Sequence, residues 1–190
     1  MKALNLGSGP HGRAGWTNVD ISISQDRRRD DGTVLVKHDL RRPLPFEDAC
    51  FDVVYTSHFL EHIDTVEAVD LLKEARRVLR AGGLTRHCIP DARLAISAYC
   101  EGRQDFMRRV DEISEDFLPP APIRTAIDYI TQAAHGWDHK CLYDPAKAKV
   151  MLTAAGFVDV REDAFDPSLD EDVALRREFS FYVQGRAPGE

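Results

Sequence analysis

Short apolar runs alternate with helical segments along most of the chain, and this alternation limits the folds that are open to it. Several of the runs are rich in β-branched or aromatic residues and are bounded by Gly, Pro or Asp, as strands are. The runs are residues 2–6, 16–20, 33–38, 52–56, 84–89, 157–163 and 179–185. Strands that alternate with helices favour a mostly parallel sheet with helices on both faces. The sequence therefore predicts an α/β fold.

Two helices can be placed from their end signals. Residues 65–80 carry apolar residues at helical spacing, with Asp64 as N-cap and Glu67 completing a capping-box pattern. The glycine pair at 82–83 is expected to end this helix. A second helix is expected over 145–155, where a proline occupies the first helical position.

Residues 91–134 interrupt the alternation of strands and helices. They are typical of two or three helices with a break at 118–122, and this segment is long for a simple crossover. We expect it to form a helical cap over one sheet edge, with 91–143 as the segment that faces the substrate. No linker divides the chain, and 190 residues fit one domain, residues 1–190.

Composition narrows the class of partner. A net charge of −7 provides no electrostatic footprint for nucleic acid, and no apolar run is long enough to span a membrane. The four cysteines contain no C-x-x-C pair, which favours reduced thiols over a disulfide framework or a zinc site. The N-terminus also lacks the features of a signal peptide. These features favour a cytoplasmic protein that acts on a small molecule.

A glycine loop follows the first predicted strand. Gly7, Gly9 and Gly12 have G-x-G-x-x-G spacing, which is typical of dinucleotide sites. Such sites place a helix N-terminus against the pyrophosphate. Only three residues separate Gly12 from Trp16, so at most one turn of helix fits there. The spacing therefore disfavours NAD and FAD.

A nucleoside without phosphates does not need that helix, and S-adenosylmethionine (SAM) is such a ligand. Asp20 follows the second predicted strand and could accept both ribose hydroxyls. Asp39 follows the third and could accept from the adenine N6, with the Leu40 N–H near N1. As an alternative, each acid could serve only as a cap or turn residue, and the glycines could form only a tight turn. Their placement at successive strand ends favours the ligand site.

Four parts of the sequence resemble, in order, segments of class I SAM-dependent methyltransferases. The closest resemblance is to the type-11-like small-molecule group, and it covers most of the chain except about 95–134. The segments are "LNLGSG…NVDIS", "HDLRRPLPFEDACFDVVYTSHFLEHI", "EARRVLRAGGLTRHCIPD" and "LYDPAKAKVMLTAAGFVDV". The resemblance implies a Rossmann-like, seven-stranded, mostly parallel sheet whose last strand is antiparallel.

The same resemblance implies a set of cofactor contacts. It implies the methionine end at Gly7, Ser8 and Gly9, the ribose at Asp20 and Ile21, the adenine at Asp39 and Leu40, and the methyl-transfer region at Ser57 and His58. The chain departs from the family in its short connection between the first two strands. This departure leaves open how fully the loop encloses the methionine carboxylate.

Histidines supply the candidate bases, because their unperturbed pKa lies near working pH. His62 and His58, in "SHFLEH", are the predicted catalytic residues. A base is needed only when the acceptor must lose a proton, as a hydroxyl does. As alternatives, His62 could close the loop before the next helix together with Glu61, and His58 could only line the cofactor pocket.

A second cluster, in "HGWDHK" and just after it, is the candidate acceptor site. It comprises His135, Trp137, His139 and Tyr143. Loops that carry aromatic residues often shape substrate pockets, although any one of these side chains could be incidental. The H-x₃-H spacings within the two histidine clusters would need helical geometry and a further ligand, so no metal site is predicted.

These features lead to one functional prediction and two alternatives. The predicted function is SAM-dependent methyl transfer to oxygen or nitrogen of a small molecule, such as a sugar or a secondary metabolite. The first alternative is a non-catalytic partner subunit that keeps the methyltransferase fold. The second is another nucleoside-handling enzyme, such as an aminopropyl transferase. The oligomeric state is left open, with a homodimer as one alternative.

Overall fold

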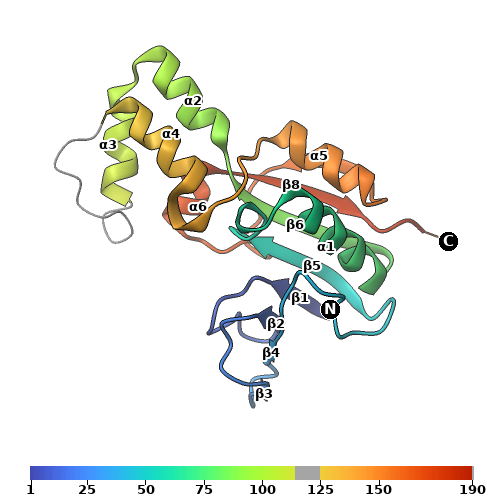
Figure 1. Ribbon diagram of the computed structural model, residues 1–190. Coiled ribbons are helices and arrows are strands. Elements are labelled where there is room, and N and C mark those ends of the chain that lie inside the picture. Colours follow the sequence, from blue (N-terminus) through green and yellow to red (C-terminus); the bar gives the residue numbers. More distant parts are fainter. Residues whose placement is uncertain (114–124, 190) are drawn as a thin grey trace.

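In the computed structural model the chain folds around one eight-stranded sheet with the order β3-β4-β2-β1-β5-β6-β8-β7 (Figure 1). The structure describes residues 1–113 and 125–189, so the expected break at 118–122 lies outside the described residues. The strands are β1 (Ala3–Leu6), β2 (Thr17–Asp20), β3 (Arg27–Arg28), β4 (Val34–Lys37), β5 (Phe51–Ser57), β6 (Leu79–Pro90), β7 (Val158–Asp163) and β8 (Ser180–Arg186). The α-helices are α1 (Thr65–Val78), α2 (Ala92–Glu101), α3 (Gln104–Ile113), α4 (Ala126–His135), α5 (Pro145–Ala154) and α6 (Ala174–Phe179).

The sheet is mostly parallel, as predicted, and its last strand is reversed. β8 pairs antiparallel with both β6 and β7. The expected number of seven strands is wrong by one, because Arg27 and Arg28 add the short strand β3 antiparallel to β4. Both β3 residues are exposed, so no apolar pattern marks this strand in the sequence.

The expected helix over 65–80 ends earlier than its glycine pair. α1 begins at the predicted N-cap, where Asp64 and Glu67 form both halves of a capping box. It ends at Val78 because Leu79 already pairs with Phe51 of β5 as the first residue of β6. The glycine pair lies inside β6, and Gly82 has a φ of +72°. The two glycines are therefore part of the strand and do not end the helix.

The two faces of the sheet are covered differently, which corrects the expectation of helices on both. Figure 1 shows α1 and α5 beside the central strands, and their buried residues share one apolar core with β1, β5 and β8. On the opposite face a smaller core joins Trp16 and Tyr55 to Leu169. No helix separates β1 from β2, or β4 from β5. The expected absence of a helix after the glycine loop is therefore confirmed.

The cap forms at the end of the sheet where β5 and β6 finish. Asp91 follows β6, accepts from the Arg93 N–H and begins α2. Figure 1 shows α2, α3 and α4 together beyond this end, away from α1 and α5. None of the helices in the described part of the chain combines the length and apolar character that a membrane span needs.

Candidate functional site

The glycine loop leaves space at the end of β1. Gly7 and Gly9 have φ values of +74° and +66°, a region that favours glycine. A Cβ at Gly7 would lie 2.2 Å from Cδ2 of Phe59, so the ring of Phe59 excludes any larger residue there. A Cβ at Gly9 would meet no atom within 4 Å. The backbone at Gly9 is therefore open to a ligand.

Asp20, at the end of β2, lies directly beside this loop. Its Oδ2 accepts from the Gly9 N–H at 2.8 Å, and its Oδ1 accepts from the Ser22 N–H at 2.8 Å. Oδ1 also accepts from the Ser22 hydroxyl at 2.6 Å, so Oδ2 is the oxygen that keeps a lone pair for a ligand hydroxyl. The adjoining Ile21 is 59% exposed, and the hydroxyl of Ser8 donates to the Gly9 carbonyl oxygen. The carboxylate thus shapes the loop and remains partly exposed.

Asp39, which follows β4, is less available to a ligand than Asp20 is. Asp39 forms a bidentate ion pair with Arg41, with both N–O distances at 2.8 Å. These hydrogen bonds from Arg41 lower the pKa of Asp39 to about 2. Leu40 is buried in the main core. An adenine amino group would therefore have to share the carboxylate of Asp39 with the Arg41 guanidinium.

The end of β5 carries the first predicted catalytic histidine. Ser57 is buried, and His58 follows it with a φ of +49°, in the left-handed region. A ring nitrogen of His58, Nε2, lies 2.7 Å from the hydroxyl of Ser180. Burial lowers the pKa of His58 to about 3, so this imidazole is neutral and only weakly basic at neutral pH.

The 3₁₀ turn after β5, η1 (Leu60–His62), positions the next two polar side chains. The Glu61 carbonyl oxygen accepts from the Lys140 N–H at 2.7 Å and from the Cys141 N–H at 3.2 Å. These two bonds tie the segment after α4 to the end of β5. His139 is consequently brought next to Glu61 and His62, although the three residues are far apart in the sequence.

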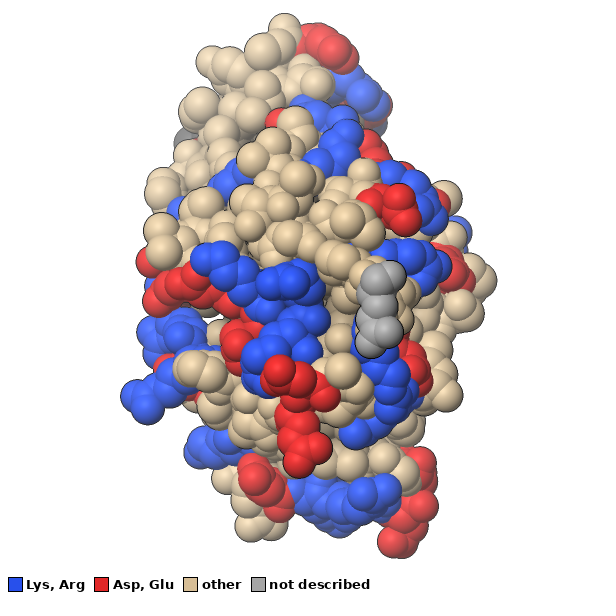
Figure 2. Space-filling view, turned by 90° about the vertical axis from the view of Figure 1, so that its right-hand side faces the viewer, with Lys and Arg blue, Asp and Glu red and all other residues tan. Residues whose placement is uncertain are grey.

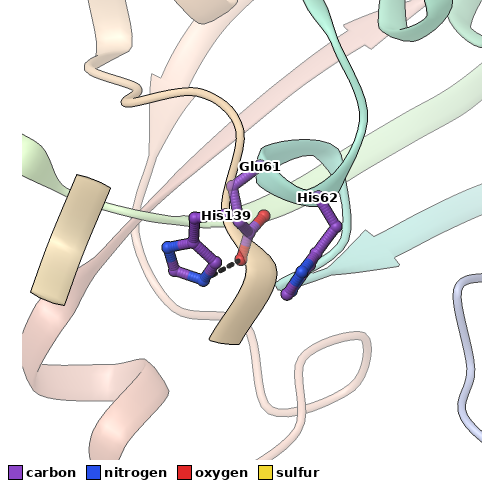
Figure 3. A group of neighbouring side chains, drawn as sticks. All are labelled: Glu61, His62 and His139. Atoms are coloured by element: carbon purple, nitrogen blue, oxygen red, sulfur yellow. Dashed lines mark ion pairs between the residues drawn. The ribbon is translucent and has the colours of Figure 1, made fainter. Parts of the chain in front are cut away.

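Glu61, His62 and His139 form the polar cluster of the site, and Figure 3 shows the carboxylate of Glu61 between the two imidazoles. Nε2 of His139 lies 4.0 Å from Oε1 of Glu61, and the centroids of the two imidazole rings are 4.8 Å apart. Glu61 is 2% exposed. Burial raises its pKa to about 8 and lowers that of His62.

A cavity of about 440 Å³ opens from this cluster into the cap. Its walls are mostly apolar and come from the cap helices, α6 and the end of β6. Representative wall residues are Ala95, Phe106, Tyr129, Ala133 and Phe179. The structure therefore places a polar end and an apolar body within one cavity.

Most of the predicted catalytic and acceptor residues meet in this cavity. His58, His62, Trp137, His139 and Tyr143 all line it. Tyr143 also belongs to the main core, where its hydroxyl donates to the Leu60 carbonyl oxygen.

The structure differs from these predictions at two residues, one that was predicted for the site and one that was not. His135 is the last residue of α4, is exposed and does not line the cavity. Glu61, which the sequence suggests only as a loop-closing partner, lies at the centre of the polar cluster. Its signal in the sequence is its position beside His62 directly after a buried strand.

Charge is distributed without a strong bias on the visible surface. Figure 2 shows acidic and basic side chains mixed across the face that it displays. A polyanion that is bound along its backbone needs a continuous basic stripe. Among its described residues, the face in Figure 2 therefore lacks the continuous basic stripe that binding of a polyanion would need.

Solved structures identify the architecture. A SAM-dependent methyltransferase from Methanosarcina mazei matches with a TM-score of 0.59 and 15% identity, over 100% of this chain and 93% of that chain. The fold is that of the class I SAM-dependent methyltransferases. The family model of a methyltransferase domain matches residues 11–86. A search of curated proteins found no match.

Two further matches show the range of proteins with this methyltransferase fold. One is a chain of the Haloferax volcanii complex that contains the Trm112 methyltransferase activator (TM-score 0.57, 15% identity, 100% of this chain and 82% of that chain). The other is the [4+2]-cyclase SpnF (TM-score 0.55, 16% identity, 100% of this chain and 76% of that chain). The fold is therefore compatible with a partner protein and with chemistry other than methyl transfer.

S-adenosylmethionine is the cofactor that the domain match and the methyltransferase fold support. The glycine loop fits this cofactor, because Gly9 leaves open space beside a partly exposed carboxylate. The same loop lacks the helix that a diphosphate would need.

Proposed function

We propose that this protein transfers a methyl group from SAM to an oxygen or nitrogen of a small acceptor held in the cap cavity. The observation that carries this proposal is the cavity of about 440 Å³, which joins the end of β5 to the polar cluster. When bound, the cofactor supplies a methyl group activated by a sulfonium. Gly7, Ser8 and Gly9 would hold its methionine end, and Asp20 with Ile21 its ribose.

The walls of the cavity suggest the character of the acceptor. Its volume lies within the range of sites for small ligands, about 300–1,000 Å³. Apolar walls from the cap favour a largely apolar body over a free sugar, because sugar hydroxyls would lose hydrogen bonds with water there. The polar cluster at one end would orient a single hydroxyl or amino group. We therefore favour an apolar metabolite with one reactive polar group.

The chain contributes mainly by positioning, since methyl transfer to a nucleophile depends on alignment of the two reacting groups. A hydroxyl acceptor must also lose a proton. Of the two predicted bases, His62 is the better candidate, because the pKa of His58 lies too low for proton abstraction at neutral pH. Both histidines line the cavity.

Calorimetry with SAM and with its demethylated product tests the cofactor. We expect binding of both, and no binding at millimolar ligand would contradict the proposal. A methyl-transfer screen against metabolite extracts, with products identified by mass, tests the acceptor. The expected result is a mass increase of one methyl group in a small apolar metabolite.

A second candidate is a non-catalytic partner subunit with the same fold. The match to a chain from an activator complex favours it as an alternative. Copurification of a stable heteromeric partner, together with cofactor binding but no transfer in the screen, would support this alternative. Cytoplasmic location remains a prediction from the sequence.

A further inference from the structure

We propose that Glu61, His62 and His139 bind a divalent transition-metal ion, represented by zinc, at the polar end of the cap cavity. The cluster does not use either H-x₃-H pair as a unit: it joins His62 from one pair, His139 from the other, and Glu61 beside His62. This inference deepens the proposed function. The role of the ion in methyl transfer rests on the proposed function, whereas binding of the ion does not. Binding of the ion itself can be measured separately.

The first argument is distance. One ligand atom from each residue lies within 4.8 Å of the others. Zinc binds nitrogen and oxygen ligands at about 2.0–2.1 Å, which separates tetrahedral ligands by about 3.3 Å. Small side-chain rotations would therefore bring the three atoms onto one ion. Figure 3 shows these side chains converging from two parts of the chain.

The second argument is the state of Glu61. Its side chain is 2% exposed, and neither carboxylate oxygen has a hydrogen-bond partner among the described residues. Imidazole nitrogens of His58 and His139 each lie 4.0 Å from Oε1, too far for a hydrogen bond. A buried carboxyl group without hydrogen-bond partners is unfavourable, whereas coordination of a cation would give the carboxylate a partner. A bound ion therefore explains an otherwise unfavourable group.

The third argument is the orientation of His139. Its Nδ1 lies 2.9 Å from the Ala133 carbonyl oxygen, which can only accept a hydrogen bond. Nδ1 must therefore carry the proton, and in the neutral ring Nε2 directs its lone pair toward Glu61. A backbone carbonyl that fixes the tautomer in this way is typical of histidines that bind metals. A lone pair facing a carboxylate is unfavourable unless a cation or a proton lies between them.

The ligand types indicate which ion fits. Two imidazoles and one carboxylate suit zinc and similar transition metals, whereas magnesium and calcium prefer oxygen ligands. Three protein ligands leave one position open, as in catalytic zinc sites. That position faces the cavity, which all three residues line. Arg176 also lines the cavity, and its positive charge acts on Glu61; its ion pair with Glu171 offsets part of the repulsion that a bound cation would feel.

The open position would bind the acceptor through its reactive oxygen or nitrogen. A hydroxyl on a zinc ion loses its proton more readily, and the proton would pass to solvent. The methyl group would then move to the oxygen as the bond between carbon and sulfur breaks and its electron pair stays on sulfur. No side-chain base would be required, so His62 would act as a ligand rather than as a base.

Titration of the chelator-stripped protein with zinc and with cobalt(II) tests the site. Calorimetry should show one zinc ion per chain with micromolar or tighter affinity. Cobalt should produce tetrahedral d–d absorption without a thiolate charge-transfer band, which would distinguish this site from binding at Cys141 nearby. Absence of zinc and cobalt binding, or a thiolate band, would overturn the proposal.

Variants locate the ion. Glu61→Gln keeps the shape of the side chain, and His139→Ala removes one imidazole; each should weaken zinc binding by about 100-fold or more. His135→Ala, an exposed histidine in the same segment, is the matched control and should bind zinc as the wild type does. Unfolding curves and SAM affinity verify that each variant is folded. Equal zinc affinity in Glu61→Gln and wild type would exclude this site, whereas zinc binding without methyl transfer would contradict only the proposed function.

Discussion

At the scale of single residues, Asp20 combines a structural role with a predicted binding role. It accepts from the Gly9 N–H and from Ser22, and so holds the loop around the open space at Gly9. Loss of its carboxylate should therefore affect the cofactor in two ways, through the ribose and through the loop. A conservative variant can separate these effects.

We expect Asp20→Ala to weaken SAM binding by at least about tenfold, since it removes a charge-assisted hydrogen bond of about 1.5–3 kcal/mol. Asp20→Asn retains one oxygen for the Gly9 N–H and should lose less affinity. Calorimetry with both variants measures the difference. An unchanged affinity in Asp20→Ala would remove Asp20 from the ribose site.

His87 illustrates a second residue-scale effect, because its imidazole is fully buried in β6. Its two ring nitrogens lie 2.7 Å and 2.8 Å from the hydroxyls of Thr56 and Thr85. Burial lowers its pKa from 6.5 to about 3. The unfolded chain therefore takes up a proton below about pH 6.5 while the folded chain does not, and stability falls as pH falls.

The free energy of unfolding should consequently decrease by up to about 1.4 kcal/mol per pH unit from this residue between pH 6.5 and pH 3. The variant His87→Gln cannot titrate and should lose this part of the pH dependence. Urea unfolding of both proteins at several pH values measures the two slopes. Parallel slopes below pH 6.5 would contradict the assignment.

At the scale of elements, an ion pair attaches the segment after β7 to the second face of the sheet. Arg86 of β6 donates through Nε to Asp170 at 2.8 Å, through Nη1 to Gln184, and through Nη2 to the Ala164 carbonyl oxygen. The side chains of Arg86 and Asp170 are almost fully buried. This pair and the apolar contacts of Leu169 hold the segment against the sheet, whereas helices α1 and α5 cover the other face.

We expect Arg86→Met to lower the free energy of unfolding by about 3–5 kcal/mol, because it leaves Asp170 buried without its partner. The double variant Arg86→Met/Asp170→Leu should recover much of that loss. Arg161→Met removes an exposed pair with Asp163 and should cost at most about 1 kcal/mol. Urea unfolding measures all three, and a small loss for Arg86→Met would show that the pair does not hold the segment.

At the scale of the whole molecule, we expect the short connection between β1 and β2 to disfavour cofactors that carry a diphosphate. The loop after β1 reaches β2 without a helix, so no helix dipole faces the ligand. A cofactor without a diphosphate suits this arrangement. The cap cavity, which is the proposed acceptor site, lies at the same end of the sheet, and His58 lines it.

SAM should therefore stabilise the folded protein, whereas NAD should not. A ligand present at 100 times its dissociation constant stabilises by about 2.7 kcal/mol. Thermal unfolding with each ligand at the same concentration measures the difference, and Asp20→Ala serves as the control with reduced stabilisation by SAM. Equal stabilisation by NAD would contradict the assignment of the loop.

Local patterns in the sequence determined the strands, the helices α1 and α5, and the missing helix after the glycine loop. Periodicity, caps and the short distance from Gly12 to Trp16 are short-range signals, so they act within one element. The exposed strand β3 escaped prediction because pairing with β4, rather than an apolar pattern, creates it.

Only the tertiary structure decided which polar side chains meet. The backbone bonds from Lys140 and Cys141 to Glu61 place His139 beside His62, and no spacing in the sequence encodes that contact. The apolar cavity likewise depends on how the cap packs against α6 and the end of β6. Contacts between distant segments depend on the packing and hydrogen bonding of the whole chain. The site lies between such segments, and for this physical reason the sequence predicts it only in part.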